Sequence, residues 1–332
     1  MPFCCKALSS TQHNVRIYKM FPQICSKKGL LFIAHRNEDE EPYDEIIVYN
    51  LVKRDNPQPP SLQNSIKINK RPTVLLLSSD CNTLAVAHEN ADDGLLRASV
   101  SFIRNILSDK PTVSNVLLDD VEGWDDDYLL NRGLNMPVTK KALEYWDEHS
   151  HMAGDLDFQD VRADYRPSVF LRPENIAWGN VEETELLINM QINNGLLRID
   201  ATEAKILDAV GYGLKDHSQV PIDLNPDDNK CDLRTYDHVF SMRNPDGITT
   251  MRYNGRLYVL TGNEGDDFEY RGFEFISEAQ DVFNVSNAHV PLIQSRKNAI
   301  AAHLQGSSLA ISNVHLGRKL YLKKHGDLQT LV

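Results

Sequence analysis

The chain has 332 residues, of which 41% are hydrophobic and 25% are charged, the composition of a soluble globular protein with one large domain or two ordinary ones. Its formal net charge of −12 argues against binding nucleic acid or an anionic membrane, which need clustered Lys and Arg, and is compatible with binding cations. No apolar run approaches the roughly 20 residues of a membrane helix, so we expect no membrane insertion.

Residues 1–24 are interpreted as an N-terminal extension. They contain one early Lys and no apolar stretch of about 7–15 residues, so no signal peptide is recognisable. The five cysteines are odd in number and lack the spacing of a metal site: Cys4, Cys5, Cys25, Cys81 and Cys231. This pattern favours free thiols, with one pair as the alternative if the protein is exported.

The core of the chain, residues 25–284, repeats a short motif. An apolar run ends in a polar turn with Asn at 30–38, 84–90, 186–194 and 257–264. After three of these turns a second strand-like stretch follows, which is typical of β-hairpins. Because propeller blades are roughly 40–50 residues long, the spacing predicts a β-propeller. We expect the turns at Asn37, Asn90, Asn194 and Asn263 to lie at equivalent positions on one rim.

The apolar runs are continuous at 30–34 and 74–79, which is typical of strands buried on both faces. A parallel sheet would show the same runs, but it needs crossover helices, and the connections here are too short and too polar. The prediction is therefore an all-β, antiparallel fold. One helix is expected at 138–152, with Thr139 as its N-cap, inside an insertion at 112–168.

Six segments, taken in order, resemble the choice-of-anchor I domain, the propeller module of the mesenchyme-specific cell-surface glycoproteins and of related bacterial and algal proteins. They are RPENIAW at 172–178, NMQINNGLLRID at 189–200, YGLKDHS at 212–218, IDLNPDDNKCD at 222–232, MRNPDGI at 242–248 and YVLTGNEGDDFEY at 258–270. The resemblance implies WD40- or YVTN-like blades, a cell-surface or extracellular location, and an association with biomineralising cells.

Three departures from the family's pattern stand out. Arg172 and Ile192 replace two Glu residues of that pattern, so two ligands would be missing from any shared cation site. The family is expected to have around seven blades, of which about four are recognisable here, so we expect an incomplete propeller. Residues 285–332 would be a C-terminal segment, possibly the start of a further blade. Open blade faces predict low stability, self-association or disorder near 285–332.

Clustered oxygen side chains make Ca²⁺ the expected cofactor, since this cation takes about 6–8 oxygen ligands. The candidate ligands lie in one acidic loop and one strand-end turn: Asp223, Asn225, Asp227, Asn229, Asp232, Asn263, Glu264, Asp266 and Asp267. The loop is not an EF-hand, because Asp228 occupies the place of its Gly and Arg234 that of its final Glu. Such segments are more often solvated turns, so a binding site is the alternative interpretation of both, and no cofactor is expected if they are turns.

Further polar residues are candidates for the same rim: Glu174, Gln191, Asn193, Asn194, Lys215, Asp216, His217 and Asp246. The run Lys215–His217 could place a general base beside a carboxylate, although such a triplet in a loop is more often structural. His149 and His151 are discounted as a metal pair, because residues two apart on a helix point to different faces.

Two classes of function fit these features. The first is a non-enzymatic surface propeller that presents an acidic rim to Ca²⁺, a mineral surface or an extracellular protein. The alternative is a metal-dependent, phosphoesterase-like hydrolase that uses the same carboxylates with Arg172, Lys215 or Arg271. The common motifs of hydrolases, nucleotide-binding enzymes and zinc proteases are missing from the sequence. Asn284 begins a glycosylation sequon, which matters only in a secreted chain.

Overall fold

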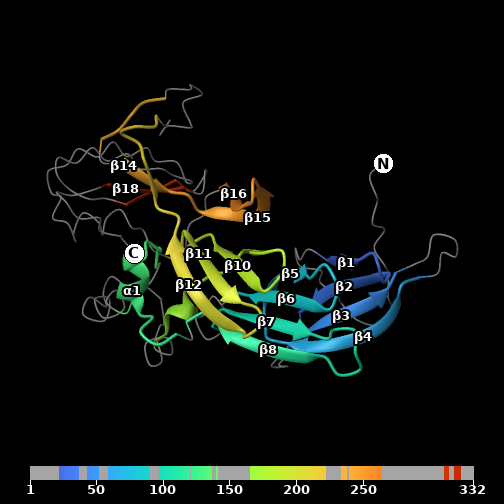
Figure 1. Cartoon of the computed structure of the whole chain (residues 1–332). Helices are drawn as coiled ribbons and strands as arrows, with labels where there is room; N and C mark the ends of the chain where they lie inside the picture. The colour runs from blue at the N-terminus through green and yellow to red at the C-terminus, as the bar shows by residue number, and fades with distance from the viewer. Residues whose placement is uncertain are drawn as a thin grey trace.

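The fold is described from a computed structural model of the chain (Figure 1). The structure describes residues 22–36, 43–51, 59–89, 97–119, 121–136, 140, 165–221, 233–237, 239–263, 310–313 and 318–322. Among the helices in these ranges, none is long and apolar enough to cross a membrane.

Three four-stranded antiparallel sheets follow one another along the chain. The first blade consists of β1 (Gln23–Cys25), β2 (Leu30–His35), β3 (Asp44–Asn50) and β4 (Ser61–Ile68). The second consists of β5 (Pro72–Leu77), β6 (Thr83–His88), β7 (Ser99–Arg104) and β8 (Thr112–Leu117). The third consists of β9 (Asn175–Trp178), β10 (Glu185–Met190), β11 (Gly195–Asp200) and β12 (Lys205–Gly211). In each sheet the strands are ordered as in the sequence, so every blade is an up-and-down meander.

The blades pack face to face over two apolar cores. One core joins the first and second blades, with Phe32, Ile46 and Leu84 completely buried. The other joins the second and third blades, with Phe102 and Ile188 at its centre. Consecutive meanders stacked through their faces are the architecture of a β-propeller, so the predicted all-β, antiparallel propeller fold is confirmed.

The burial of each strand follows its place in the row. In β6, β7 and β10, five of the six residues are buried, because these strands lie between two neighbouring sheets. β2 alternates between buried and half-exposed residues. The expectation that 30–34 is buried on both faces is therefore wrong, because the first blade has a described neighbour on one side only.

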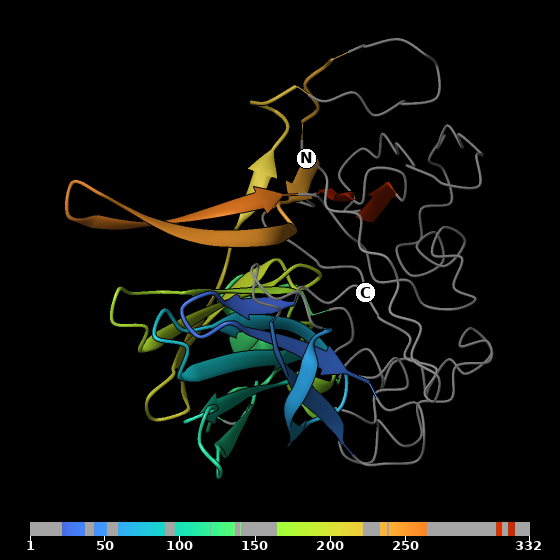
Figure 2. The same ribbon diagram turned by 90° about the vertical axis from the view of Figure 1, so that its right-hand side faces the viewer.

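Two further sheets occur in the described residues. β15 (Pro245–Tyr253) and β16 (Arg256–Asn263) form a hairpin. Its turn has positive φ at Asn254 and Gly255, as a two-residue type I′ turn requires. The hairpin lies above the blades in Figure 2, where β15 contacts β9 and β10 of the third blade. The other sheet has the order β13 (Leu214–Asp216), β14 (Val239–Met242), β18 (Arg318–Leu322) and β17 (Ala310–Asn313).

Helical structure is short in the described part of the chain. It comprises α1 (Asp126–Asn131), capped by the carboxylate of Asp125, and a 3₁₀ turn at Pro167–Val169. α1 and β8 lie within the predicted insertion at 112–168, and the 3₁₀ turn lies at its end. The second blade therefore extends further along the chain than its apolar pattern indicates. The helix predicted at 138–152 lies outside the described residues except for residue 140.

Candidate functional site

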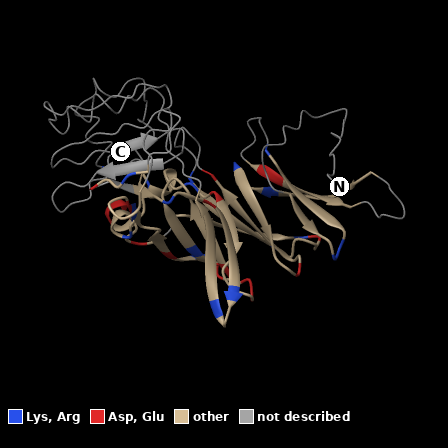
Figure 3. Cartoon of the chain, turned by 90° about the horizontal axis from the view of Figure 1, so that it is seen from above, with Lys and Arg blue, Asp and Glu red and all other residues tan. Residues whose placement is uncertain are grey.

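Several of the polar residues singled out in the sequence lie at one end of the blades in the described part of the chain, and we call this end the polar rim. It is the end at which β2, β6, β10 and β16 finish and at which β5, β9 and β15 begin. The strand registers define it, since Pro72 pairs with His88, Asn175 with Asn189 and Pro245 with Asn263. Charged residues in the described region lie mainly at strand ends and in connections (Figure 3).

The candidates divide into those that the structure describes and those that it does not. Gln191, Asn193 and Asn194 form the β10–β11 turn at the rim, Glu174 precedes β9, and Asp246 lies in β15. Asn263 ends β16, and its side-chain oxygen accepts a hydrogen bond from the Thr261 hydroxyl. The remaining candidate ligands lie outside the described residues: Asp223, Asn225, Asp227, Asn229, Asp232, Glu264, Asp266 and Asp267. Asn37 and Asn90 are also outside, so their equivalence with Asn194 stays a prediction.

Asn193 holds three chain segments together through its buried side chain. Its amide nitrogen donates to the carbonyls of Asn135 (2.9 Å) and Phe170 (3.0 Å). Its amide oxygen accepts from the backbone N–H of Arg172 at 2.9 Å. The residue is completely buried, and its bonds satisfy backbone groups both in the segment that follows α1 and in the segment that precedes β9.

Asn194 connects the third blade to the β15–β16 hairpin in a similar way. Its side-chain oxygen accepts from the backbone N–H groups of Arg243 (3.0 Å) and Asn244 (3.2 Å), just before β15. Its amide nitrogen donates to the Gly213 carbonyl at 3.1 Å. The first blade repeats the arrangement, since a carboxylate oxygen of Asp44 accepts from the backbone N–H of Arg71 at 2.7 Å. In both cases, a side-chain oxygen at or just before the third strand of a blade accepts hydrogen bonds from backbone N–H groups just before the first strand of the next sheet. We call this arrangement a clamp.

A second group of polar residues links β9, β10 and β15. The Asn189 amide donates to the carbonyls of Asp246 and Gly247, both at 3.1 Å. A carboxylate oxygen of Asp246 accepts from the Asn175 amide at 2.9 Å. The Tyr212 hydroxyl donates to the Asn189 oxygen, and burial raises the pKa of this phenol. The sequence analysis did not select Asn189 as a candidate. The local signal that could have identified it is a polar residue inside an otherwise apolar run.

His217 is buried rather than open to a substrate. Its Nδ1 lies 2.9 Å from the Val220 carbonyl and its Nε2 lies 2.9 Å from the Ser241 hydroxyl. A carboxylate oxygen of Asp216 accepts from the backbone N–H of Ser218 at 2.9 Å. Both ring nitrogens therefore contact internal groups, which favours the structural interpretation of this triplet.

His88, at the end of β6, has the same pattern of contacts. Nδ1 lies 3.1 Å from the Lys70 carbonyl and Nε2 lies 2.7 Å from the Ser101 hydroxyl. Burial lowers the pKa of His88 to about 4, against a smaller upward effect of its backbone hydrogen bonds. The imidazole is therefore neutral at physiological pH, and its Nδ1–H donates to the carbonyl.

The insertion contributes one buried carboxylate, Asp126 at the start of α1. Its two oxygens accept from the Tyr165 hydroxyl (2.5 Å) and from the backbone N–H of Lys140 (2.8 Å). Burial raises the pKa of Asp126, although the Tyr165 hydrogen bond acts in the opposite direction. These contacts tie three parts of the insertion together. Across the described ranges, no group of three or more His, Cys, Asp or Glu side chains could hold a metal ion.

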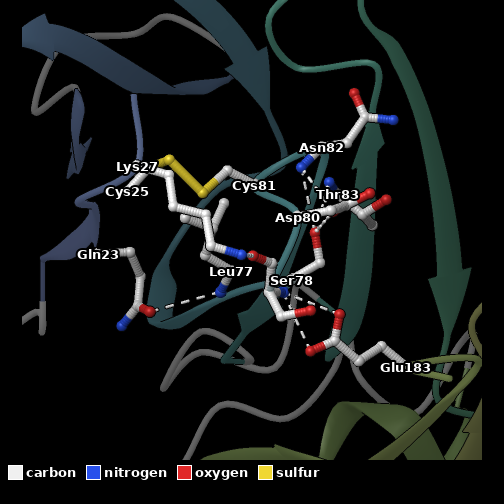
Figure 4. The surroundings of a disulfide bond; sticks show 11 residues. Gln23, Cys25, Lys27, Leu77, Ser78, Asp80, Cys81, Asn82, Thr83 and Glu183 are labelled. Atoms are coloured by element: carbon white, nitrogen blue, oxygen red, sulfur yellow. Dashed lines mark hydrogen bonds between the residues drawn. A yellow bond between two sulfur atoms is a disulfide. The ribbon is translucent and has the colours of Figure 1, made fainter. Parts of the chain in front are cut away.

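A disulfide joins the first two blades. Cys25 at the end of β1 and Cys81 in the β5–β6 turn are bonded, with their Cα atoms 5.9 Å apart and both residues buried. The same turn contacts the blades on either side (Figure 4). Lys27 donates to the Ser79 carbonyl at 3.0 Å, and the Glu183 carboxylate accepts from the Ser79 N–H at 2.8 and 3.0 Å. The expectation of free thiols is therefore wrong for Cys25 and Cys81, whereas Cys4, Cys5 and Cys231 lie outside the described residues.

The fold and the rim define an antiparallel β-propeller whose polar side chains connect one blade to the next. The chain belongs to the choice-of-anchor I domain family, whose sequence model matches residues 9–330. The resemblance inferred from the six sequence segments is therefore confirmed. No curated protein sequence matches the chain.

Solved structures provide distant matches. A functionally unknown protein from Desulfotomaculum acetoxidans is 17% identical, with a TM-score of 0.30 over 55% of this chain and 39% of its own. The hydrazine synthase of Kuenenia stuttgartiensis is 10% identical, with a TM-score of 0.36 over 73% and 58%. The β-propeller domain of the Trilobed protease from Pyrococcus furiosus is 10% identical, with a TM-score of 0.31 over 76% and 56%. At these TM-scores the likeness carries no argument, and the chain spans less than two thirds of each of these structures.

Proposed function

We propose that this chain is a non-enzymatic propeller that acts at the cell surface or outside the cell, where it binds Ca²⁺, a mineral surface or an extracellular protein. The observation that carries the location is the buried Cys25–Cys81 disulfide. Disulfides of this kind persist in oxidising compartments and are rare in the cytosol. Membership of the choice-of-anchor I family supports the same location.

The use of the rim side chains supports a binding role rather than catalysis. Asn193 and Asn194 have both ends of their amides bonded to the main chain, and His217 has both ring nitrogens in contact with internal groups. Polar groups whose hydrogen bonds are all internal stabilise the rim and are not available to act on a substrate. The side chains left as candidates for binding a ligand are therefore the carboxylates that the sequence places at 223–232 and 264–267.

The proposed ligand at these loops is Ca²⁺, bound through oxygens. Isothermal titration of the full chain with CaCl₂ tests it, comparing wild type with the double variant Asp227→Asn/Asp266→Asn. A matched control is Asp109→Asn/Glu203→Gln, which removes the same charge from exposed turns at the end of the blades that lies opposite the polar rim. We expect wild type and control to bind and the first double variant to lose at least ten-fold in affinity.

Absence of heat with wild type, or equal binding by all three proteins, would remove Ca²⁺ from this proposal. Hydrolysis of a phosphate monoester by wild type that the Asp227→Asn/Asp266→Asn variant loses would support the hydrolase instead. The location is tested separately, by expressing the chain with an export signal and in the cytosol. Only the exported chain should show the Cys25–Cys81 bond on non-reducing peptide mapping.

A further inference from the structure

The sequence contains two Asn-Gly pairs, Asn194–Gly195 and Asn254–Gly255. Both asparagines lie in turns between antiparallel strands, and both have a φ of 49°. An asparagine followed by glycine is open to attack by its own main chain, because glycine has no Cβ to hinder the approach. The two pairs therefore carry the same chemistry in different surroundings.

The reaction of such a pair is an intramolecular substitution that releases ammonia. The backbone nitrogen of the glycine loses its proton and bonds to Cγ of the asparagine, and the side-chain nitrogen leaves with that proton as ammonia. The product is a cyclic succinimide. Water then opens the ring at either carbonyl, which gives aspartate or isoaspartate. Water is the only co-reactant.

The attack requires the Asn–Gly peptide to rotate out of the turn conformation, and at Asn194 this rotation is opposed by hydrogen bonds. The side-chain oxygen of Asn194 accepts from the N–H groups of Arg243 and Asn244, and its amide donates to Gly213. Its backbone carbonyl, which belongs to the rotating peptide, accepts from the Tyr212 N–H at 2.9 Å. Asn194 is 1% exposed, so the reaction there needs local unfolding of the rim.

The surroundings of Asn254 are open. Asn254 and Gly255 form the two-residue turn of the β15–β16 hairpin, and the last pair of the ladder is Tyr253 with Arg256. Figure 2 shows this turn at the left-hand end of the hairpin. Both turn residues are exposed, and nothing lies within 4 Å of the Cβ position of Gly255. Rotation here disturbs only the end of a hairpin, where opening costs little free energy.

We propose that Asn254 is a site of spontaneous deamidation in the folded protein, whereas the clamp protects Asn194 until the chain unfolds. The modification places a new carboxylate between Arg252 and Arg256. Isoaspartate also inserts a methylene group into the main chain of the turn, which changes the geometry that a type I′ turn requires. The charge and the shape of the hairpin end therefore change as the protein ages.

Peptide mapping of the full chain by mass spectrometry tests this proposal. The folded protein is incubated at mildly alkaline pH in heavy-oxygen water, so that conversion during incubation is distinguished from conversion during digestion. Tryptic peptides 253–256 and 163–198 contain the two sites. We expect Asn254 to convert at least about ten-fold faster than Asn194, with heavy oxygen in the product and isoaspartate among the products. In guanidinium chloride the two sites should convert at similar rates.

The matched control is Asn254→Gln, because a longer side chain would have to form a larger ring and reacts far more slowly. Conversion at position 254 should stop in this variant, and that of Asn194 in guanidinium chloride should be unchanged. An unmodified Asn254 in the folded protein, or equal conversion of both sites there, overturns the proposal. Conversion to aspartate without isoaspartate excludes the cyclic route. If Asn194 still lags in the unfolded chain, local sequence and not the clamp protects it.

Discussion

Asn194 shows how one rim residue contributes to the fold. It lies at φ 49° and is 1% exposed, and its side chain accepts from two backbone N–H groups that precede the next inner strand. An oxygen that accepts two internal hydrogen bonds has both of its lone pairs occupied. The polar turn that in the sequence resembles a ligand site is therefore, at this position, a connection between blades.

We expect Asn194→Ala to lower the free energy of unfolding by about 3 kcal/mol, since it leaves buried N–H groups without acceptors. Urea unfolding measures this loss. Asn254→Ala is the matched control, because Asn254 has the same φ of 49° at an exposed position. It should lose only about 1 kcal/mol, the cost of a left-handed backbone for alanine. Equal losses would show that conformation, and not the clamp, is responsible.

His88 predicts a pH dependence of stability. Its pKa falls from 6.5 to about 4 on folding, so between these values the unfolded chain binds a proton that the folded chain excludes. The associated stability is fully present above about pH 6.5 and is lost as pH falls toward about 4; one pKa unit is roughly 1.4 kcal/mol, so the loss is about 3 kcal/mol. Unfolding free energies across this range should fall less steeply for His88→Asn. Parallel curves for the two proteins would contradict this.

At the scale of elements, the disulfide and the contacts of Arg132 join parts of the chain that are distant in sequence. The Cys25–Cys81 bond spans 56 residues and links β1 to the second blade. The segment after α1 approaches β12 closely, since the backbone N–H of Gly211 donates to the Arg132 carbonyl at 2.8 Å. The Arg132 guanidinium also pairs with the Asp208 carboxylate at 2.7 Å.

The disulfide should stabilise the chain by about 4 kcal/mol, because it restricts the unfolded state over a long loop. Urea unfolding with and without a thiol reductant tests this, using wild type and Cys25→Ser/Cys81→Ser. We expect the reductant to lower the stability of wild type to that of the double variant and to leave the variant unchanged. A wild type that is insensitive to reductant while unfolded in urea would contradict the bond.

Gly211 is required by the approach of the insertion to β12. A Cβ atom there would lie 1.9 Å from the Gly133 carbonyl oxygen, so Gly211→Ala must separate the two segments. We expect a loss of about 2 kcal/mol or more in thermal or urea unfolding. Gly262→Ala, in the hairpin, is the control because nothing lies within 4 Å of its Cβ position; it should change stability by about 0.5 kcal/mol or less. If both variants behave alike, the close approach is not formed.

At the scale of the whole molecule, the stacking of the blades decides which strands are buried. β6, β7 and β10 lie between two neighbouring sheets, and five of the six residues of each are buried. β2 alternates between buried and half-exposed residues, because the first blade has a described neighbour on one side only.

Much of the fold could be predicted from local pattern. The runs at 30–34, 84–88 and 186–190, each followed by a polar turn and a second strand, correspond to β2–β3, β6–β7 and β10–β11. Strand alternation and turn chemistry depend on neighbouring residues, so they are readable along the chain. The six ordered segments were likewise sufficient for the family.

Contacts between distant residues were not readable in this way. The sequence did not pair Cys25 with Cys81, and it did not distinguish an Asn that clamps a backbone from an Asn that could bind a cation. Gly211 carries no local signal of the carbonyl that approaches it. These features depend on which segments the stacked blades bring within hydrogen-bonding or van der Waals distance. Only the three-dimensional packing determines that, because residues dozens of positions apart meet there.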